Sequence, residues 1–247
     1  DGIFETILIL GGVPQLLTSH IKRWQHSAQE LEMDVPPNEE IIRELINEGI
    51  NRCSLHQKTG SVRLNWSRGY NVSRGIDLPV KRMNASTHRF WLEINSITTN
   101  FNPISTIISR QEKRNANSKL SSHKTFAYIQ SIQARQEALQ CGCDEALMES
   151  TNGEICCGTT ANIIIKRKNK YLTPRIQSGC LPGIMRQQGL NAGLIKESQI
   201  NIQPESDDEW LLINSLSCRP IYKVNDMDLP IYSNPKAFWL SLLKHKF

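Results

Sequence analysis

The stretch Ser121-Ser122-His123-Lys124-Thr125-Phe126-Ala127-Tyr128 lies near the middle of the chain and holds the lysine around which the other motifs are ordered. The polar run 114–118 before it is typical of a connector, and the run 129–140 after it predicts a helix. A lysine at such a junction can be held in a partly dry site, where it loses its proton more easily and becomes a nucleophile or base. Taken alone, the octet is more typical of a solvated lysine in a first helical turn, so the flanking motifs decide.

The composition suits a globular protein with a substantial core, since 39% of the 247 residues are hydrophobic and 21% are charged. The net charge of +5 fits an anionic small substrate or a nucleic acid equally well. However, the densest basic run, 166–170, lies between apolar runs without interleaved aromatic residues, so it predicts a hairpin turn and no nucleic-acid contact. The apolar runs are too short to span a membrane, and no basic segment precedes 4–10 to make a signal peptide.

The cysteines favour a reduced, cytoplasmic protein, because there are seven of them and none forms a C-x-x-C pair. A zinc site made of Cys141, Cys143, Cys156 and Cys157 is the alternative, but the spacing is not that of a zinc site and no metal is predicted. The chain begins at Asp1 inside a strand pattern, so we expect that a first strand precedes it.

Three parts of the sequence predict groups that bind phosphate. A helix expected to begin at Thr18 or Ser19 carries Arg23 near its N-terminus. Pro182 is expected in the first turn of a second helix, and the hydroxyl-rich run 214–217 predicts a turn. Each alone is more commonly a surface feature, but with the central lysine they suit a cofactor that carries an aldehyde and a phosphate.

Two further regions bear on the organisation of the chain. The loop 67–75 contains two arginines that can clasp carboxylates, although an ordinary hairpin tip has the same pattern. Regular strand order lapses from Ser109 to Ser122. We therefore predict an N-terminal domain at 1–110, a connector at 111–122 and a C-terminal domain with a barrel-like core at 123–247.

A series of short motifs, in order along nearly the whole chain, resembles the fold-type IV pyridoxal-phosphate enzymes. That family includes branched-chain and D-amino-acid aminotransferases and 4-amino-4-deoxychorismate lyases. The motifs are Asp1-Gly2-Ile3-Phe4-Glu5-Thr6, His20-x-x-Arg23, Ser67-Arg68-Gly69, Lys124-Thr125-x-x-Tyr128, Gly142-x-Asp144-Glu145-Ala146-Leu147, Thr160-x-Asn162, Leu172-Thr173-Pro174, Gly183-Ile184-Met185-Arg186 and Asn214-Ser215-Leu216. The resemblance implies a mixed α/β (α+β) fold of two domains, the cofactor in the cleft between them, and a homodimer.

Within the family, the lyases are the most similar. Residues 183–187, the two Arg-Gly pairs of the 67–75 loop, and 214–216 carry this likeness, and the aminotransferases usually have Thr or Ser where Met185 stands. The resemblance implies a cytoplasmic lyase that releases pyruvate from 4-amino-4-deoxychorismate and leaves 4-aminobenzoate for folate synthesis. An aminotransferase and a non-catalytic relative are the two alternatives.

The resemblance also assigns residues to the cofactor and the substrate. Lys124 would bond the cofactor aldehyde and then act as the general base, and Tyr128 would hydrogen-bond the ring oxygen. Phosphate binding is implied for Arg23, the backbone N–H groups of Ile184 and Met185, and Ser215 or Ser217. Cys157 and Thr160 belong to the same cofactor site, and Arg68 and Arg74 are the candidates for the substrate carboxylates.

Cys157 is a departure from the family, which has a Glu at this position, five residues before Asn162, to pair with the pyridine nitrogen. A carboxylate keeps that nitrogen protonated, whereas a thiol does so only when it is ionised. Glu154 is close in sequence, but in a strand it points to the opposite face. Three hypotheses follow: a Cys157 thiolate, a neutral nitrogen with less demanding chemistry, or a degenerate relative.

Overall fold

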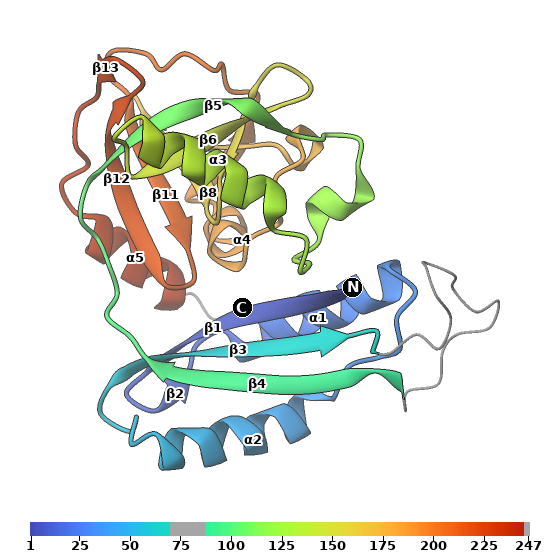
Figure 1. Cartoon of the computed structure of the whole chain (residues 1–247). Coiled ribbons are helices and arrows are strands. Elements are labelled where there is room, and N and C mark those ends of the chain that lie inside the picture. Colours follow the sequence, from blue (N-terminus) through green and yellow to red (C-terminus); the bar gives the residue numbers. More distant parts are fainter. Residues whose placement is uncertain (70–86, 245–247) are drawn as a thin grey trace. The chain divides into compact units, whose positions relative to one another are not determined.

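The computed structural model describes residues 1–69 and 87–244, which divide into two compact units (Figure 1). Unit 1 comprises residues 1–98 and 124–127, and unit 2 comprises residues 99–123 and 128–247. Arg74, one of the two predicted substrate residues, lies outside the described residues. Among the described helices, none is both long and apolar enough to cross a membrane.

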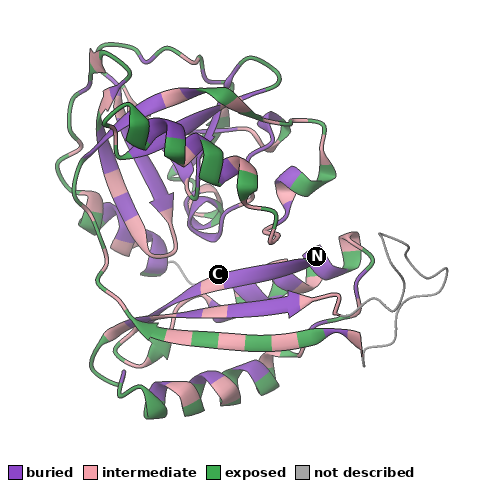
Figure 2. Ribbon diagram, viewed as in Figure 1, coloured by how far each residue is buried: buried purple, intermediate pink, exposed green. Residues whose placement is uncertain are grey.

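Unit 1 is a four-stranded antiparallel sheet with two helices on one face. The sheet has the order β2-β1-β3-β4, and β1 pairs with β3 so that Ile3 lies opposite Trp66. The elements are β1 (Gly2–Leu10), β2 (Val13–Pro14), α1 (Leu17–Glu30), α2 (Glu39–Arg52), β3 (Thr59–Ser67) and β4 (Arg89–Ser96). Alternate residues of the strands pack against apolar positions of both helices to form the core, and Figure 2 shows β1 and β3 largely buried.

The two helices of unit 1 begin differently. The N-cap of α2 is Asn38, whose side chain accepts a hydrogen bond from the Ile41 N–H at 3.0 Å. The predicted cap of α1 at Thr18 or Ser19 was wrong, because the N-cap is Leu16, with a φ of 52° and no capping side chain. The turn that closes the β1–β2 hairpin places Leu17 in the core and starts the helix two residues early.

Unit 2 is built around a barrel of strands. Its sheet has the order β10-β9-β8-β11-β12-β5-β6-β7, and β7 pairs back onto β8, which closes the ring. The strands are β5 (Ile104–Arg114), β6 (Glu145–Ser150), β7 (Ile155–Gly158), β8 (Asn162–Arg167), β9 (Lys170–Pro174), β10 (Ile195–Ser198), β11 (Glu209–Asn214), β12 (Ser217–Val224) and β13 (Met227–Asp228). The helices are η2 (Lys119–Ser122), α3 (Ile129–Gln140), η3 (Ile176–Ser178), α4 (Ile184–Asn191) and α5 (Pro235–Lys244). Interior strand residues such as Ile163 and Leu212 fill the ring.

The boundary predicted between the two halves was wrong. Residues 109–114 do not belong to a connector but continue β5, which pairs with both β12 and β6. The polar run is tolerated because the ladder shifts register there and the buried Glu137 carboxylate accepts hydrogen bonds from Ser109 Oγ at 2.6 Å and from the Arg110 N–H at 3.0 Å. The division between the units falls instead after Thr98.

The Lys124 segment belongs to unit 1 and not, as predicted, to the C-terminal half. Phe4 N–H donates to the Lys124 carbonyl at 2.9 Å, Phe126 N–H donates to the Gly2 carbonyl at 2.9 Å, and Ile3 and Thr125 form a bridge. These long-range bonds attach residues 124–127 to the edge of β1. The helix predicted at 129–140 is confirmed as α3.

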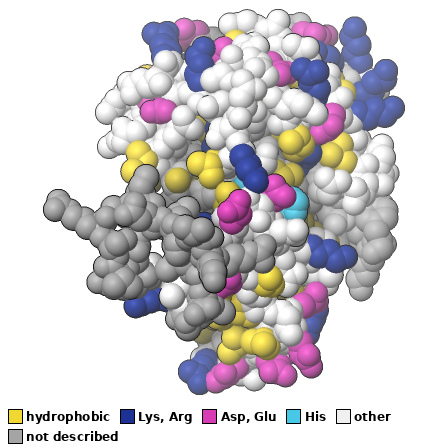
Figure 3. All heavy atoms as spheres, turned by 90° about the vertical axis from the view of Figure 1, so that its right-hand side faces the viewer, with side chains coloured by type: hydrophobic (Ala, Val, Ile, Leu, Met, Phe, Trp, Pro, Cys, Tyr) yellow, Lys and Arg dark blue, Asp and Glu magenta, His cyan; other side chains and the backbone are white. Residues whose placement is uncertain are grey.

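Charged side chains of both signs are spread over the surface. On the face drawn in Figure 3, Lys and Arg are interspersed with Asp and Glu instead of gathering in one basic patch. The basic run 166–170 spans a hairpin turn, as predicted, with Lys168 and Asn169 at positive φ between β8 and β9. Within the described part of the chain, no group of His, Cys, Asp and Glu could hold a metal ion.

Candidate active site

Lys124 is fixed at both its backbone and its side chain within unit 1. Its ammonium lies over the ring of Phe4, with Nζ 4.1 Å from the ring centroid, and its carbonyl accepts the Phe4 N–H. Phe126 packs on the same ring with the centroids 6.2 Å apart. Gly2 is required for this arrangement, because a Cβ at that position would lie 2.3 Å from a ring carbon of Phe126. Residues of the Asp1-Gly2-Ile3-Phe4 motif therefore make the contacts that position the Lys124 backbone and ammonium.

Glu5, the next residue of β1, is buried on the helix side of the sheet and neutralised there. Arg23 donates to both carboxylate oxygens, at 2.7 Å from Nε and 2.6 Å from Nη2, and His20 Nδ1 lies 2.7 Å from Oε2. Burial raises the pKa of Glu5, but the charges and hydrogen bonds of Arg23 and His20 outweigh it and bring the pKa to about 2. Burial lowers the pKa of His20, and Glu5 opposes that shift.

This cluster explains the His20-x-x-Arg23 motif as one turn of α1 that faces one carboxylate. Nε and Nη2 of Arg23 are bound to Glu5, which orients the guanidinium. The role of Arg23 toward a phosphate stays a prediction.

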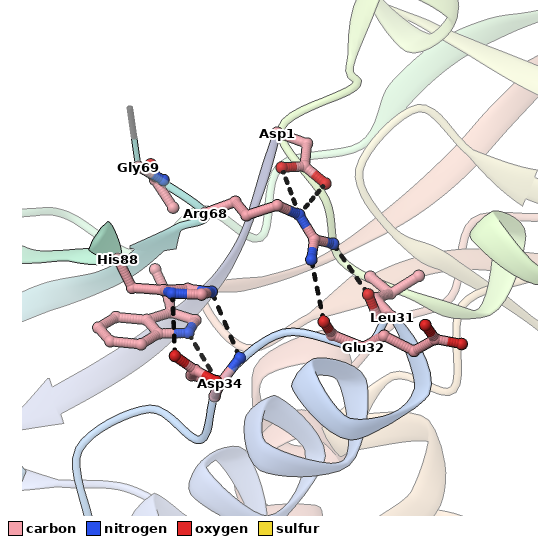
Figure 4. A network of polar contacts seen from close by, with 9 residues as sticks. Asp1, Leu31, Glu32, Asp34, Arg68, Gly69 and His88 are labelled. Carbon is pink, nitrogen blue, oxygen red and sulfur yellow. Dashed lines mark hydrogen bonds and ion pairs between the residues drawn. The ribbon is translucent and has the colours of Figure 1, made fainter. Parts of the chain in front are cut away.

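Arg68 is engaged by its own unit (Figure 4). Nε lies 3.1 Å from each carboxylate oxygen of Asp1, and the two terminal nitrogens donate to the carbonyls of Glu32 at 2.9 Å and Leu31 at 2.8 Å. The guanidinium thereby ties the end of β3 to the C-terminal end of α1. A substrate carboxylate would have to displace Asp1 to reach it, and the structure gives no direct support to the predicted substrate role.

Beside Arg68, a second polar network closes the same end of the sheet (Figure 4). The His88 ring stacks on Trp66 with centroids 5.0 Å apart, and His88 Nδ1 lies 3.4 Å from Asp34 Oδ2. The Asp34 carbonyl accepts the Trp66 indole N–H at 3.0 Å. These contacts hold the segment after α1 against β3.

Arg63 of β3 is the residue that the sequence reasoning missed. Its guanidinium carbon lies 3.8 Å from the centroid of the Phe4 ring, the ring that Lys124 also contacts. The signal was present in β3, where the polar Arg63 and Asn65 alternate with the apolar Val62 and Leu64. That alternation shows which face Arg63 occupies, but not what lies on it.

In unit 2, a β-bulge lets the side chains of the neighbouring residues Cys156 and Cys157 face the same apolar cluster. The β6–β7 ladder pairs Met148 with Cys157 but Glu149 with Ile155, so Cys156 is an extra residue and both thiols turn toward one apolar cluster. The hydrogen bond from Cys156 lowers the pKa of Cys157, burial raises it, and the Arg114 charge lowers it, with a net lowering. The same hydrogen bond and burial raise the pKa of Cys156.

Glu154 does not replace the missing family carboxylate. It is buried, and its Oε1 lies 3.3 Å from Nη2 of Arg175 in an ion pair. The negative charge of Glu145 acts on Cys157 and raises the pKa of its thiol. That carboxylate is itself bound by Arg135 and by the Thr159 hydroxyl at 2.6 Å. Whether Cys157 acts as a thiolate stays a prediction.

The N-terminus of α4 is suited to an anion. Its N-cap is Gly183, which has no side chain to cap the first-turn N–H groups, among them those of Ile184 and Met185. A glycine is needed there, because a Cβ would lie 1.9 Å from Oδ1 of Asn162. The predicted place of Pro182 in the first turn was wrong, since the helix begins only at Ile184.

The hydroxyl-rich turn lies between β11 and β12, as predicted. Asn214 Oδ1 accepts from the Leu216 N–H at 2.8 Å and from Ser217 Oγ at 3.1 Å, so the Ser217 hydroxyl is engaged within the turn. Asn214 Nδ2 donates to the carbonyl of Thr160 at 3.4 Å, which joins this turn to the loop after Cys157. The phosphate role of Ser215 or Ser217 stays a prediction. Tyr128 is the half-buried N-cap of α3.

Comparisons with known proteins show which proteins the chain is similar to. The sequence model of the amino-transferase class IV family matches residues 2–224. A Bacillus subtilis protein named aminodeoxychorismate lyase is 21% identical over 261 residues, covering 99% of this chain and 85% of the relative. A crystal structure described as a putative 4-amino-4-deoxychorismate lyase from Legionella pneumophila superposes with a TM-score of 0.84 at 23% identity, over 98% of this chain and 90% of the other. A hypothetical aminotransferase from Mycobacterium tuberculosis in a PLP-bound form gives 0.79 at 21%, over 98% and 87%. The structures share the fold.

Proposed function

Since the chain belongs to the class IV aminotransferase family, whose members depend on pyridoxal phosphate, we propose that it is a lyase that releases pyruvate from 4-amino-4-deoxychorismate and leaves 4-aminobenzoate. The observation that carries the proposal is the position of Lys124. Its amine lies over the Phe4 ring, and its carbonyl accepts the Phe4 N–H. Residues 183–187 and 214–216 resemble the lyases of the family more than its aminotransferases, which favours this reaction over amino-group transfer.

The residues present fit a cofactor that carries an aldehyde and a phosphate. Considered by itself, unit 1 holds an amine, that of Lys124, which fits the aldehyde. Considered by itself, unit 2 holds the uncapped N-terminus of α4, which fits a phosphate. When bound, pyridoxal phosphate supplies an aldehyde that captures the substrate amine and a ring that withdraws electrons from the neighbouring atoms. The N–H groups of Ile184 and Met185 would hold its phosphate.

Lys124 then has two tasks in the reaction. Its amine would hold the cofactor in the resting protein and, once displaced by the substrate amine, would remove the proton from the substrate ring as the general base. The backbone bonds to β1 hold the Lys124 backbone in place, and the ammonium lies over the Phe4 ring. Loss of pyruvate makes the product ring aromatic, which drives the step.

An aminotransferase is the second candidate, and Cys157 separates the two. Transfer of an amino group depends more heavily on a protonated ring nitrogen than an elimination that ends in an aromatic product does. The thiol of Cys157, with its hydrogen bond from Cys156, is a weaker substitute for the family carboxylate. The position therefore favours the lyase.

The decisive test is incubation of the cofactor-loaded protein with 4-amino-4-deoxychorismate, with pyruvate and 4-aminobenzoate measured together. The lyase gives both in equal amounts, whereas amino-group transfer to a keto acid without 4-aminobenzoate would reject it. Protein that stays colourless with added pyridoxal phosphate would indicate a non-catalytic relative. Borohydride reduction and peptide mapping are expected to place the cofactor on Lys124.

A further inference from the structure

The hydroxyl of Thr159 is fixed in the short loop between β7 and β8. Thr159 is buried, and its hydroxyl donates to Glu145 Oε1 at 2.6 Å and accepts from Arg135 Nη2 at 2.8 Å. The loop itself is closed by the Gly158 N–H, which donates to the Ala161 carbonyl at 2.9 Å. Since a hydroxyl has only one proton to donate, these two side-chain contacts fix the direction in which the Thr159 hydroxyl points.

Glu145 and Arg135 form the frame that holds this hydroxyl. Glu145 is buried at the start of β6, where its Oε1 also accepts from the Ala146 N–H at 2.9 Å. Arg135 reaches the carboxylate from α3, with Nε 2.8 Å from Oε1 and Nη2 paired with Oε2. A two-point contact between a guanidinium and a carboxylate orients both groups, so the frame presents fixed partners to Thr159.

The residues that follow Thr159 connect this frame to both parts of unit 2 for which phosphate binding is proposed. The Thr160 carbonyl accepts from Nδ2 of Asn214, the first residue of the hydroxyl-rich turn, at 3.4 Å. Asn162 Nδ2 donates to the Leu181 carbonyl at 2.8 Å, in the segment that leads into α4. Because Thr160 and Asn162 follow Thr159 closely in one short segment, a shift of Thr159 displaces both contacts.

The exposure of Arg135 allows the frame to be opened without disturbing the core of unit 2. Its side chain is 36% exposed, whereas Glu145 and Thr159 are buried. An ion pair that reaches the surface usually contributes little to stability, so these contacts matter chiefly for where they hold the loop. Removal of the Arg135 charge is therefore expected to release Thr159 while the barrel stays folded.

We propose that Arg135 and Glu145 are positioning residues, which hold the phosphate-binding groups of unit 2 in place through the Thr159 hydroxyl. The groups that they position are the N–H groups at the N-terminus of α4 and the 214–217 turn. The inference rests on the proposed function in one respect, that unit 2 receives the phosphate of pyridoxal phosphate. It applies to a lyase and to an aminotransferase alike.

The test compares the binding of pyridoxal phosphate with that of pyridoxal, which has the same ring and aldehyde but no phosphate. Dissociation constants are measured from the absorbance of the bound ligand in the wild type, Arg135→Gln, Arg135→Lys, Thr159→Val and Thr159→Ser. The control is Lys113→Gln, because Lys113 also reaches the surface and pairs with Glu149 of the same strand, β6, at 3.0 Å. Thermal unfolding without ligand shows whether each variant is folded.

We expect Arg135→Gln and Thr159→Val to weaken the binding of pyridoxal phosphate about tenfold or more and to leave that of pyridoxal unchanged, because only the phosphate contacts move. Thr159→Ser keeps the hydroxyl and should restore the wild-type dissociation constant. Arg135→Lys should give an intermediate value, since lysine keeps the charge but not the two-point contact. Lys113→Gln should bind both ligands as the wild type does.

Three results overturn the inference. They are equal weakening of both ligands, a folded Thr159→Val protein that binds pyridoxal phosphate as tightly as the wild type, and a wild type that binds pyridoxal phosphate no more tightly than pyridoxal. The comparison of Thr159→Val with Thr159→Ser decides the question if Arg135→Gln does not fold.

The outcome is separable from the lyase assignment. A protein that makes no 4-aminobenzoate but loses affinity for pyridoxal phosphate alone on Thr159→Val refutes the lyase and supports the role of Arg135 and Glu145. A protein that makes 4-aminobenzoate, and whose preference for pyridoxal phosphate over pyridoxal is the same in every variant, supports the lyase and refutes that role.

Discussion

Phe4 and Glu5 are neighbours in β1, yet they face two regions of opposite character. On the helix side, Glu5 is buried, its charge is matched by Arg23, and His20 Nδ1 lies at hydrogen-bond distance. On the other side, the Phe4 ring carries the cations of Lys124 and Arg63, and no carboxylate of the described residues pairs with Arg63. A protein commonly satisfies its buried charges within itself, so the Glu5 side is expected to govern stability, whereas the Phe4 side carries the lysine of the proposed reaction.

The largest effect should come from removing the amine on the Phe4 side. Lys124→Ala is expected to reduce formation of 4-aminobenzoate by at least about a thousandfold, because both the covalent anchor of the cofactor and the general base are lost. Stability should change little, since the backbone bonds of Lys124 to β1 remain. The rate of product formation and urea unfolding check this, and Lys22→Ala on the exposed surface of α1 is the control. Retained activity would remove Lys124 from the reaction.

The charge on the helix side should control stability instead. Glu5→Gln is expected to destabilise the protein by about 3 kcal/mol at neutral pH, because Arg23 loses its buried partner. Urea unfolding measures this difference. A loss below about 1 kcal/mol would mean that Glu5 is not the anchor of the cluster.

The same carboxylate predicts an acid limit. The folded pKa of Glu5, about 2, lies below its ordinary value of 4.5, so its contribution is present above about pH 4.5 and is lost as the pH falls toward 2. Stability measured from pH 6 to pH 2 should decline more steeply in the wild type than in Glu5→Gln. Parallel curves would contradict the assignment.

A double-mutant cycle sharpens the contrast within the helix side. Glu5→Gln, Arg23→Met and the double variant should show a coupling of about 1–3 kcal/mol, because each single change strands the other partner. Additive effects would show that the two side chains do not act as a unit.

The smallest effect is expected across from Arg63. Glu93→Gln should change stability by less than about 0.5 kcal/mol, since glutamine still accepts from Asn65 and Trp91 and no ion pair with Arg63 is lost. Thermal unfolding tests this. A loss of stability of more than about 1 kcal/mol would mean that Glu93 neutralises Arg63. Both faces of the sheet would then hold a cation paired with a carboxylate of the chain.

Local structure was largely predictable. The helix at 129–140, the hairpin turn at 166–170 and the turn at 214–217 follow from periodicity and turn residues, which act over a few positions. Features set by distant contacts were missed. The run 109–114 appeared irregular because its polar residues are stabilised by Glu137, which lies in another element.

The candidate site divides in the same way. The motif around Lys124 and its likeness to pyridoxal-phosphate enzymes could be found from residues alone, because the chemistry needs those residue types. Sequence reasoning chose Arg68 and Arg74 for the substrate, since an arginine in a glycine-rich loop is a common carboxylate ligand. Arg74 lies outside the described residues, and the nitrogens of Arg68 are bound to Asp1 and to carbonyls after α1.

The sequence by itself therefore determined the family and most of the local elements, and it singled out Lys124 as the candidate for the reacting amine, since all of these depend on residue identity and short-range spacing. Only the tertiary structure decided which unit contains Lys124 and which arginine lies over the Phe4 ring. Both depend on strand register, because the pairing of β1, β3 and β4 places Phe4, Arg63 and Asn65 together while it separates Arg63 from the carboxylate directly opposite.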